Sequence, residues 1–374
     1  MDAHLFRHEP RPLLGILTMA DTKRKFRGNH RNFADIVLTG NARGAEVYVV
    51  TMDDLSLQEP RIKAYAYRQE KEDWVLRWIP LPRVLYNRIP RREDEQQPQV
   101  RDLLRECMRN PRVKLFNPSF FNKWMMKRWL CRSPITKKYI PVTKRFTATT
   151  RILPLLRKYG FLYLKPEHGK AGKGIVRVQR SRGSKPYTLY SQDNGQTTSE
   201  SFTTLRELKA SIRQRIEDED YIIQQGIELC SSKGRSYDLR LLLQKNRKGV
   251  WAVTGVGARV AGATSITTHV PQGGSIGEPN RLLNNSFGPA RGKRIYRRVR
   301  SSGLRIAKQI EKASGKQQGE MSMDLGIDKT GNVWFFEANA KPMKFDEPAI
   351  RELSLKRLID YAVYLGNSKR NAPL

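Results

Sequence analysis

The stretch that decides the fold lies in the last sixth of the chain and reads MSMDLGIDKTGNVWFFEANAKP (residues 321–342). Two runs with strand-like alternation flank Lys329-Thr330-Gly331-Asn332, a composition typical of a short hairpin loop. If these four residues close a β-hairpin, Asp324 lies opposite Glu337. The large side chains are then expected on the other face of the hairpin: Met323, Leu325, Ile327, Trp334, Phe336 and Ala338.

The same register places Ser322 opposite Asn339, beside the acidic pair. Two carboxylates that face each other on one side of a sheet repel. A divalent cation removes that cost, and hard oxygen ligands suit Mg²⁺ that holds nucleotide phosphates. An acidic pair that simply faces solvent is the alternative, and a lone motif does not decide between the two.

Composition limits the classes of protein. A chain of 374 residues predicts two or three domains. Its formal net charge of +34 attracts anionic partners, of which nucleic acid is the usual one. The basic residues occur in nearly every segment, however, without zinc-finger spacing or an RNP-type aromatic signature. Nonspecific affinity of a cationic surface for polyanions is therefore at least as strong an interpretation as dedicated nucleic-acid recognition.

Three observations predict a cytoplasmic protein without a transmembrane segment. The N-terminal region resembles no secretion signal. No apolar run approaches the length of about 20 residues that spans a bilayer. Cys107, Cys131 and Cys230 are odd in number and far apart, as expected of free thiols in a reducing compartment.

The N-terminal part of the chain predicts an α/β unit. Residues 12–18 and 46–51 have strand character, and residues 32–44 between them have helical spacing. We place the end of this domain near residue 116. Residues 117–130 then fit an amphipathic helix that carries Lys123.

A second concentrated signal is a glycine-rich loop between two expected strands, residues 161–165 and 175–180. Glycines at 169, 172 and 174 let backbone N–H groups approach a polyphosphate. The loop is not a Walker motif, because no helix with Gly-Lys-Ser/Thr follows it, nor is it a Rossmann turn. A flap over phosphates and an ordinary solvent-exposed hairpin tip are both consistent with it.

The remaining segments complete the second half of the chain. Residues 181–200 are polar and predict an exposed excursion. Residues 238–244 and 251–259 predict two strands, with Asp238 and Arg240 on one face by the strand period of two. Residues 291–312 predict a basic amphipathic helix that packs on a sheet, although binding to a membrane surface or a calmodulin-type partner also suits such a helix.

Six motifs in this order resemble the ATP-grasp superfamily, and within it the YheC/YheD-type endospore coat-associated proteins. They are VLYNRI (84–89), FNKW (121–124), YLKPEHGKAGKGI (163–175), IIQQGI (222–227), YDLR (237–240) and WFFEANAKPMKFDEP (334–348). The resemblance implies an α/β (α+β) fold with a pre-ATP-grasp domain followed by a two-lobed ATP-grasp fold. Its expected divisions are residues 1–116, a first lobe with the flap at 117–225, and a C-terminal lobe with the hairpin at 226–374.

The resemblance also assigns site residues. The ATP contacts it implies are two lysines, the flap and a hinge segment: Lys123, Lys165, Glu167, His168, Gly169, Lys170, Gly172, Lys173, Gly174, Gln224, Gln225, Gly226, Ile227 and Glu228. Arg240 and Arg259 match catalytic positions that neutralise phosphate or acyl-phosphate charge. Asp324, Glu337 and Asn339 match ligands of two Mg²⁺ ions, with Mn²⁺ as a substitute.

Two segments depart from the pattern of many superfamily ligases, and both border the expected acceptor site. Thr267-Thr268-His269 stands where an Asn is common, and Ala340-Lys341-Pro342-Met343 follows the last metal ligand. We assign His269, Gly273, Gly274 and Lys341 to the acceptor site. The sequence does not identify the second substrate.

Three functions remain open. The first is an ATP- and Mg²⁺-dependent ligase that joins a carboxylate to an amine or thiol through an acyl-phosphate. The second is a weakly catalytic or non-catalytic ATP-binding protein of the spore coat that binds polyanions. The third, nucleic-acid binding, predicts a steep salt dependence together with a sequence or structure preference.

Overall fold

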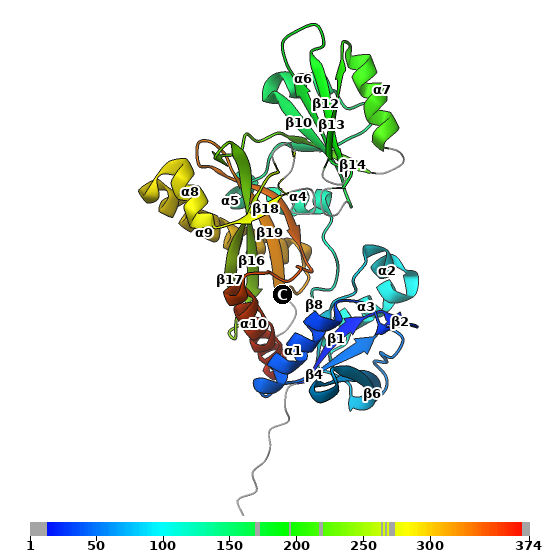
Figure 1. Cartoon of the computed structure of the whole chain (residues 1–374). Coiled ribbons are helices and arrows are strands. Elements are labelled where there is room, and N and C mark those ends of the chain that lie inside the picture. Colours follow the sequence, from blue (N-terminus) through cyan, green and yellow to red (C-terminus); the bar gives the residue numbers. More distant parts are fainter. Residues whose placement is uncertain are drawn as a thin grey trace, which may run out of the picture.

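The computed structural model describes residues 13–168, 173–193, 196–216, 220–262, 265, 268 and 274–368. Three large β-sheets organise these residues, and each is built from a separate stretch of the chain (Figure 1); residues 20–21 and 25–26 form a fourth, two-stranded sheet. Within this described part, no helix combines the length and apolarity needed to cross a membrane. The mixed α/β class expected from the sequence is confirmed.

The first sheet has the strand order β6-β5-β4-β1-β7-β8. Its strands are β1 (Leu13–Thr18), β4 (Glu46–Thr51), β5 (Arg61–Arg68), β6 (Asp73–Pro80), β7 (Val84–Asn87) and β8 (Lys114–Phe116). The other elements of this part are β2 (Ala20–Asp21), β3 (Lys25–Phe26), α1 (His30–Ala42), the 3-10 turn η1 (Gln69–Lys71), α2 (Arg92–Gln96) and α3 (Pro98–Arg109). Strand β1 pairs in parallel with β4 and β7, so the predicted strand–helix–strand unit is confirmed.

The second sheet has the order β13-β12-β11-β10-β14-β9 and carries the glycine-rich loop. Its strands are β9 (Thr143–Arg145), β10 (Phe161–Pro166), β11 (Val176–Arg180), β12 (Tyr187–Asp193), β13 (Gln196–Phe202) and β14 (Tyr221–Gln225). Helices α6 (Ile152–Tyr159) and α7 (Leu205–Ile216) pack on this sheet, whereas α4 (Lys123–Cys131) and α5 (Pro134–Lys137) precede it in sequence and pack on the part of the chain that carries the third sheet. Strands β10 and β11 are antiparallel, as predicted. The expected excursion at 181–200 is wrong in part, because β12 and β13 pair there as an edge hairpin whose second strand is mostly exposed.

The third sheet has the order β18-β17-β16-β19-β20. Its strands are β15 (Ser231–Ser232), which pairs at the end of β16, and β16 (Arg235–Lys245), β17 (Trp251–Val260), β18 (Ser275–Gly277), β19 (Glu320–Ile327) and β20 (Val333–Asn339). The helices of this part are α8 (Pro279–Phe287), which the sequence analysis missed, α9 (Pro289–Ser314) and α10 (Pro348–Asn367). Helix α9 buries Ile295, Val299 and Ile306 against the sheet and leaves its basic residues outside, which confirms the packing interpretation.

The hairpin β19–β20 has the predicted register at the acidic pair, with Asp324 opposite Glu337. A β-bulge follows directly, and it shifts the pairing so that Leu325 lies opposite Phe335. Because a one-residue shift exchanges the two faces of a strand, Phe335 enters the core with 4% exposure. The expectation that Phe336 and Trp334 point to the core face is therefore wrong: both are only half-buried.

Helix α10 joins the first sheet to the third. Figure 1 shows it leaving the third sheet and passing beside α1. Its Tyr361 packs edge-on against Phe116, with ring centroids 5.4 Å apart, and Phe116 stacks on Tyr86 at 4.7 Å. These side chains belong to one apolar cluster that contains residues of both parts. The cluster fixes the first sheet relative to α10.

Candidate functional site

One face of the third sheet carries a row of charged side chains across adjacent strands. Arg240 on β16 pairs with Asp324 on β19, and Asp324 pairs with Glu337 on β20. One step along the strands, Asp238 on β16 pairs with Arg259 on β17. The strand period of two puts these five side chains on the same face, as the sequence predicted for Asp238 and Arg240.

Arg259 holds two carboxylates of this face together. Its Nε and Nη2 donate to the two oxygens of Asp238, both at 3.0 Å, and Nη2 lies 2.7 Å from Oδ2 of Asp324. Burial acts to lower the pKa of the guanidinium, but the charges of Asp324 and Asp238 together raise it. The side chain is only 8% exposed. The guanidinium expected to face phosphate is thus engaged by carboxylates and orients Asp324.

Arg240 is the more accessible arginine of the row, with 23% of its side chain exposed. Its Nη2 donates to Oγ of Ser322 at 3.3 Å, and its Nη1 lies 3.8 Å from Oδ1 of Asp324. The guanidinium also lies 5.7 Å from the ring centroid of Phe345. A long contact to Asp324 leaves this cation able to neutralise an added anion.

The predicted metal ligands lie together at the end of the hairpin. Asn339 pairs with Ser322 and its amide donates to Oε1 of Glu337 at 3.5 Å. Among the described residues, no three His, Cys, Asp or Glu side chains form a metal-binding group. A cation here would therefore take two carboxylates, an amide oxygen and oxygens of other molecules. That hard-oxygen donor set fits Mg²⁺, which keeps several ligands from water or phosphate.

Two lysines from the preceding part of the chain approach Glu337. The Nζ of Lys165 on β10 donates to Oε1 of Gln224 at 2.7 Å and lies 5.5 Å from the ring centroid of Phe336. Burial lowers the pKa of Lys165 to about 8, while the charge of Glu337 acts in the opposite direction. Burial likewise lowers the pKa of Lys123, and Glu337 again opposes it. The structure thus brings both predicted lysines to the carboxylate row.

Lys123 begins helix α4, which Asn122 caps by accepting from the backbone N–H of Met125 at 2.9 Å. The Asn122 amide also lies 3.4 Å from Glu167 and 3.4 Å from His168, at the start of the glycine-rich loop. Burial lowers the pKa of His168. The helix start and the loop start are therefore joined through one side chain.

The glycine-rich loop is described only at its ends. Glu167 is buried and pairs with Arg145 at 3.0 Å, so its carboxylate does not face outward. Gly174 has a φ of +69°, and its carbonyl accepts from the Tyr221 hydroxyl at 3.0 Å. Lys173 is exposed. The predicted flap residues Gly169, Lys170 and Gly172 lie outside the described residues.

The hinge segment is held by the second sheet. The N–H of Gln225 donates to Val142 at 2.8 Å, and the N–H of Gly226 donates to Phe161 at 3.0 Å. A Cβ on Gly226 would lie 2.2 Å from the Phe161 ring, so this position requires glycine. Glu228 is exposed and pairs with Lys329 at 2.8 Å. Ile227 lies between them, half-buried.

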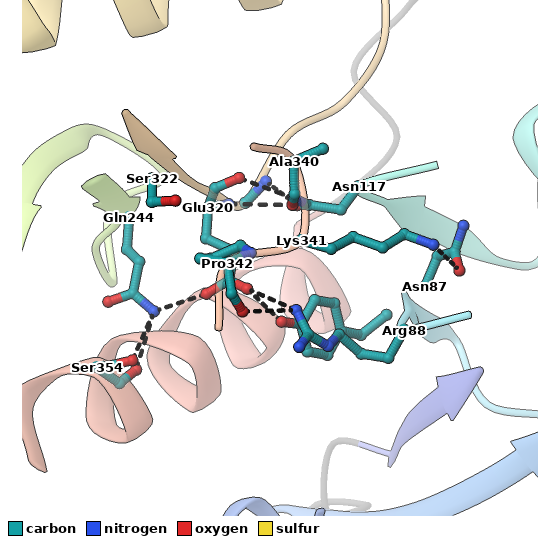
Figure 2. Close-up of polar contacts among 12 residues, drawn as sticks. Asn87, Arg88, Asn117, Gln244, Glu320, Ser322, Ala340, Lys341, Pro342 and Ser354 are labelled. Atoms are coloured by element: carbon teal, nitrogen blue, oxygen red, sulfur yellow. Dashed lines mark hydrogen bonds and ion pairs between the residues drawn. The ribbon is translucent and has the colours of Figure 1, made fainter. Parts of the chain in front are cut away.

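Of the four predicted acceptor residues, the structure describes only Gly274 and Lys341. His269 and Gly273 lie outside the described residues, and Gly274 precedes β18. Lys341 points to the first sheet, where its Nζ donates to Oδ1 of Asn87 at 2.9 Å (Figure 2). It also donates to the carbonyl of Ile89 at 2.9 Å.

Lys341 also forms a buried ion pair with Glu95. Burial lowers the pKa of Lys341 to about 8, and Glu95 opposes that effect. Three acceptors of the first domain thus bind its ammonium, and the assignment of Lys341 to the acceptor site stays a prediction.

A buried polar network that the sequence analysis missed holds the open end of the hairpin (Figure 2). The Asn117 amide donates to the carbonyls of Glu320, at 2.8 Å, and Ala340, and its oxygen accepts from the N–H groups of Gly319 and Glu320 at 2.8 and 3.2 Å. Arg88 donates to the carbonyl of Pro342 at 3.2 Å. Both strands of the hairpin are therefore tied to segments far away in sequence.

Glu320 is the buried carboxylate of this network. It accepts from the hydroxyl of Tyr86 and from Nε2 of Gln244 at 3.0 Å, and it lies 3.5 Å from Arg88. Burial raises the pKa of Glu320, while Arg88 opposes that effect. No local motif signals these contacts, because each partner comes from a different segment.

Comparison with known proteins identifies the family of this chain. A family model described as YheC/D-like ATP-grasp matches residues 112–365. The endospore coat-associated protein YheD of Bacillus subtilis (strain 168) is 28% identical over 97% of this chain and 80% of its own length. The D-Ala:D-Ser ligase VanG from Enterococcus faecalis is 13% identical, with a TM-score of 0.54 over 95% of this chain and 99% of its own. The ATP-grasp ligase PsnB, solved with a phosphomimetic variant of its minimal precursor, Mg and ADP, is 11% identical, with a TM-score of 0.51 over 96% and 99%.

Proposed function

Because this chain belongs to the YheC/D-like ATP-grasp family, we propose that it is an ATP- and Mg²⁺-dependent ligase that joins a carboxylate to an amine or a thiol. One observation carries the proposal: the paired Asp324 and Glu337 lie near two half-buried lysines, Lys123 on α4 and Lys165 on β10 of the second sheet. Such an arrangement of carboxylates and cations suits a nucleoside triphosphate with its metal.

The proposal divides the chain into a pre-ATP-grasp domain, residues 1–116, a first lobe, residues 117–225, and a C-terminal lobe, residues 226–374. Adenine would lie at the hinge segment, and the phosphates would extend under the glycine-rich loop toward the hairpin. The contacts between β10, β14 and the hairpin support this placement, since Lys165 touches both Gln224 and the ring of Phe336.

In this proposal, Lys123 and Lys165 neutralise phosphate oxygens, and Asp324, Glu337 and Asn339 would hold Mg²⁺. A bound Mg²⁺ supplies positive charge on the phosphates as ADP leaves. Arg259 keeps Asp324 in place, and Arg240 faces the transferred phosphoryl group. Catalysis then rests on positioning and charge neutralisation, and it needs no protein nucleophile.

The reaction has two steps. An oxygen of the substrate carboxylate attacks the γ-phosphorus, the bond to the β–γ bridging oxygen breaks, and ADP leaves. The amine or thiol then attacks the acyl carbon of the acyl-phosphate, inorganic phosphate leaves, and the nucleophile loses its proton.

Lys165 gives this site a distinct pH signature. With a pKa of about 8 in the free protein, its ammonium is charged below that pH and becomes neutral above it. A bound polyphosphate favours the charged form, so binding of Mg·ATP should take up close to one proton at about pH 9 and almost none at about pH 7.

Calorimetry in buffers with different ionisation enthalpies measures this uptake, and affinity for Mg·ATP should fall as the pH rises through 8. Lys165→Arg is the matched variant, because arginine stays charged throughout. It should bind without the extra proton. The same proton uptake in both proteins would remove Lys165 from the phosphate site.

A second candidate is an ATP-binding protein of the spore surface with little or no turnover. The net charge of +34 favours it, as does similarity to a protein named as endospore coat-associated. The two candidates differ in one measurement, because only the ligase consumes ATP when it receives its substrates.

The deciding experiment is an ADP-release screen of the purified protein with Mg·ATP against pooled carboxylates, amines and thiols. The ligase should release ADP and phosphate only when a matching pair is present. Mg·ATP binding without ADP release across a broad panel would favour the second candidate. Absence of Mg·ATP binding would overturn both.

A further inference from the structure

A groove runs along α10 on the side that faces α1 and the turn between β16 and β17. Two adjoining cavities form it, with volumes of about 330 and 560 Å³, and they share Arg43, Arg247 and Asp360. Figure 1 shows α10 and α1 side by side at this position. The groove is thus built by the first domain and the C-terminal lobe together.

The walls of the groove carry five cations and one carboxylate: Arg43, Arg247, Lys248, Lys356, Arg357 and Asp360. Asp360 pairs with Arg43 at 2.5 Å. In the described part of the chain, no ion pair joins a carboxylate to any of the other four cations. Arg357 donates to the hydroxyl of Thr254 at 2.9 Å; burial and the charge of Arg300 lower its pKa, while the charge of Asp360 acts in the opposite direction. The positive charge of the groove is therefore largely uncompensated.

The floor of the groove is apolar. Leu353 lines the first cavity, and Ile359, Val363 and Tyr364 line the second. The Tyr364 ring is 37% exposed and packs beneath Gly249 of the β16–β17 turn, where a Cβ would lie 2.4 Å from the ring. A ligand of this groove would combine an anionic group with an apolar or aromatic part.

We propose that this groove is a second anion site, separate from the ATP site, that takes a small phosphorylated organic compound. Guanidinium groups match phosphate oxygens in pairs, and three of the five cations are arginines. Both cavities have volumes typical of small-molecule sites. Cations from three segments converge on one concave space here; Arg357 is half-buried, and the other four are exposed at the rim.

The basic residues of α9 provide the contrasting case. Lys293 and Arg297 are exposed on that helix and line neither cavity of the groove. Their removal lowers the net charge of the protein by the same amount as removal of two groove cations. These two residues therefore serve as the control that distinguishes binding in the groove from general attraction of anions to the protein.

The test is a calorimetric titration of the full chain with inorganic pyrophosphate in the absence of Mg²⁺. Arg247→Gln/Lys356→Gln should weaken binding by at least about tenfold, whereas Lys293→Gln/Arg297→Gln should change it by less than about twofold. Lys165→Met shows whether pyrophosphate binds in the groove or in the ATP site, because binding in the groove should persist in that variant. If the double groove variant does not fold, Lys356→Gln alone should still weaken binding by about threefold.

Two further probes test which kind of phosphorylated compound the groove binds. Phenyl phosphate should bind more tightly than inorganic phosphate if the apolar floor contributes, and the difference should disappear in Tyr364→Ser. Equal losses in the groove and α9 variants would overturn the proposal, as would loss of all pyrophosphate binding in Lys165→Met. Long-chain polyphosphate is the second probe. If it binds more tightly than pyrophosphate, and both double variants weaken its binding equally, the proposal is overturned in favour of nonspecific polyanion binding.

Discussion

Replacement of Glu337 by Gln is expected to lower Mg²⁺-dependent ADP formation by at least about 100-fold. The change removes one of only two carboxylates that face each other at the hairpin. A neutral amide is a weaker ligand for a hard cation, and it also removes the negative charge that supports protonation of Lys165 and Lys123. Both consequences act on the same phosphates.

The fold should tolerate this substitution. Glu337 is half-buried and lies opposite Asp324, so neutralising it relieves repulsion rather than creating it. ADP release is measured with a substrate pair found in the screen, and Mg·ATP affinity by titration if no pair is found, with an expected loss of about tenfold or more. Glu352→Gln on α10 is a matched control with the same charge change at an exposed position. ADP release at the wild-type rate by Glu337→Gln would sink the ligase proposal.

The sequence predicts the parts of the site that depend on local pattern. The hairpin register at Asp324 and Glu337 follows from its loop and its alternation, and the structure confirms it. The antiparallel strands around the glycine-rich loop are confirmed for the same reason. The bulge after Asp324 has no such signal, because alternation alone cannot show where a strand gains one residue. The predicted face of Phe336 is therefore wrong.

Contacts between distant segments could not be predicted from pattern. Lys341 follows the metal ligands directly, which suggested an acceptor role, yet its ammonium binds Asn87, Ile89 and Glu95, residues about 250 positions earlier. The charge of a lysine in a sequence does not indicate which acceptors its ammonium contacts in the fold. Family resemblance assigns Lys123 and Lys165 to the nucleotide, and in the structure the charge of Glu337 acts to raise the pKa of both lysines.

Asn117 is the clearest case of such a contact, and its replacement by Ala should cost about 3–6 kcal/mol of folding free energy. Its side chain is fully buried and bonds two carbonyls and two N–H groups at the open end of the hairpin. Alanine leaves these four backbone groups without their partners. It also places an unsuited residue at a φ of +54°, a conformation that asparagine tolerates.

Urea unfolding followed by circular dichroism measures the loss, and two further variants divide it into its causes. Asn117→Gly removes the hydrogen bonds without backbone strain, so it should lose most of the same free energy. Asn246→Ala is the matched control, because Asn246 also accepts from two backbone N–H groups but in an exposed turn, and should cost about 1 kcal/mol or less. If Asn117→Gly matched the wild type while Asn117→Ala did not, backbone strain would be the whole effect.

The same variants connect the network to the site. Strands β19 and β20 carry Asp324 and Glu337, and Asn117 binds the residues at which those strands enter and leave the hairpin. Without these hydrogen bonds the open end of the hairpin is free to move, and the two carboxylates can separate. The affinity of Asn117→Gly for Mg·ATP should therefore fall by about tenfold, measured under conditions in which the variant is still folded. Asn246→Ala should retain wild-type affinity. Unchanged affinity in Asn117→Gly, with its stability lowered as expected, would mean that the hairpin keeps its shape without this tie to the first domain.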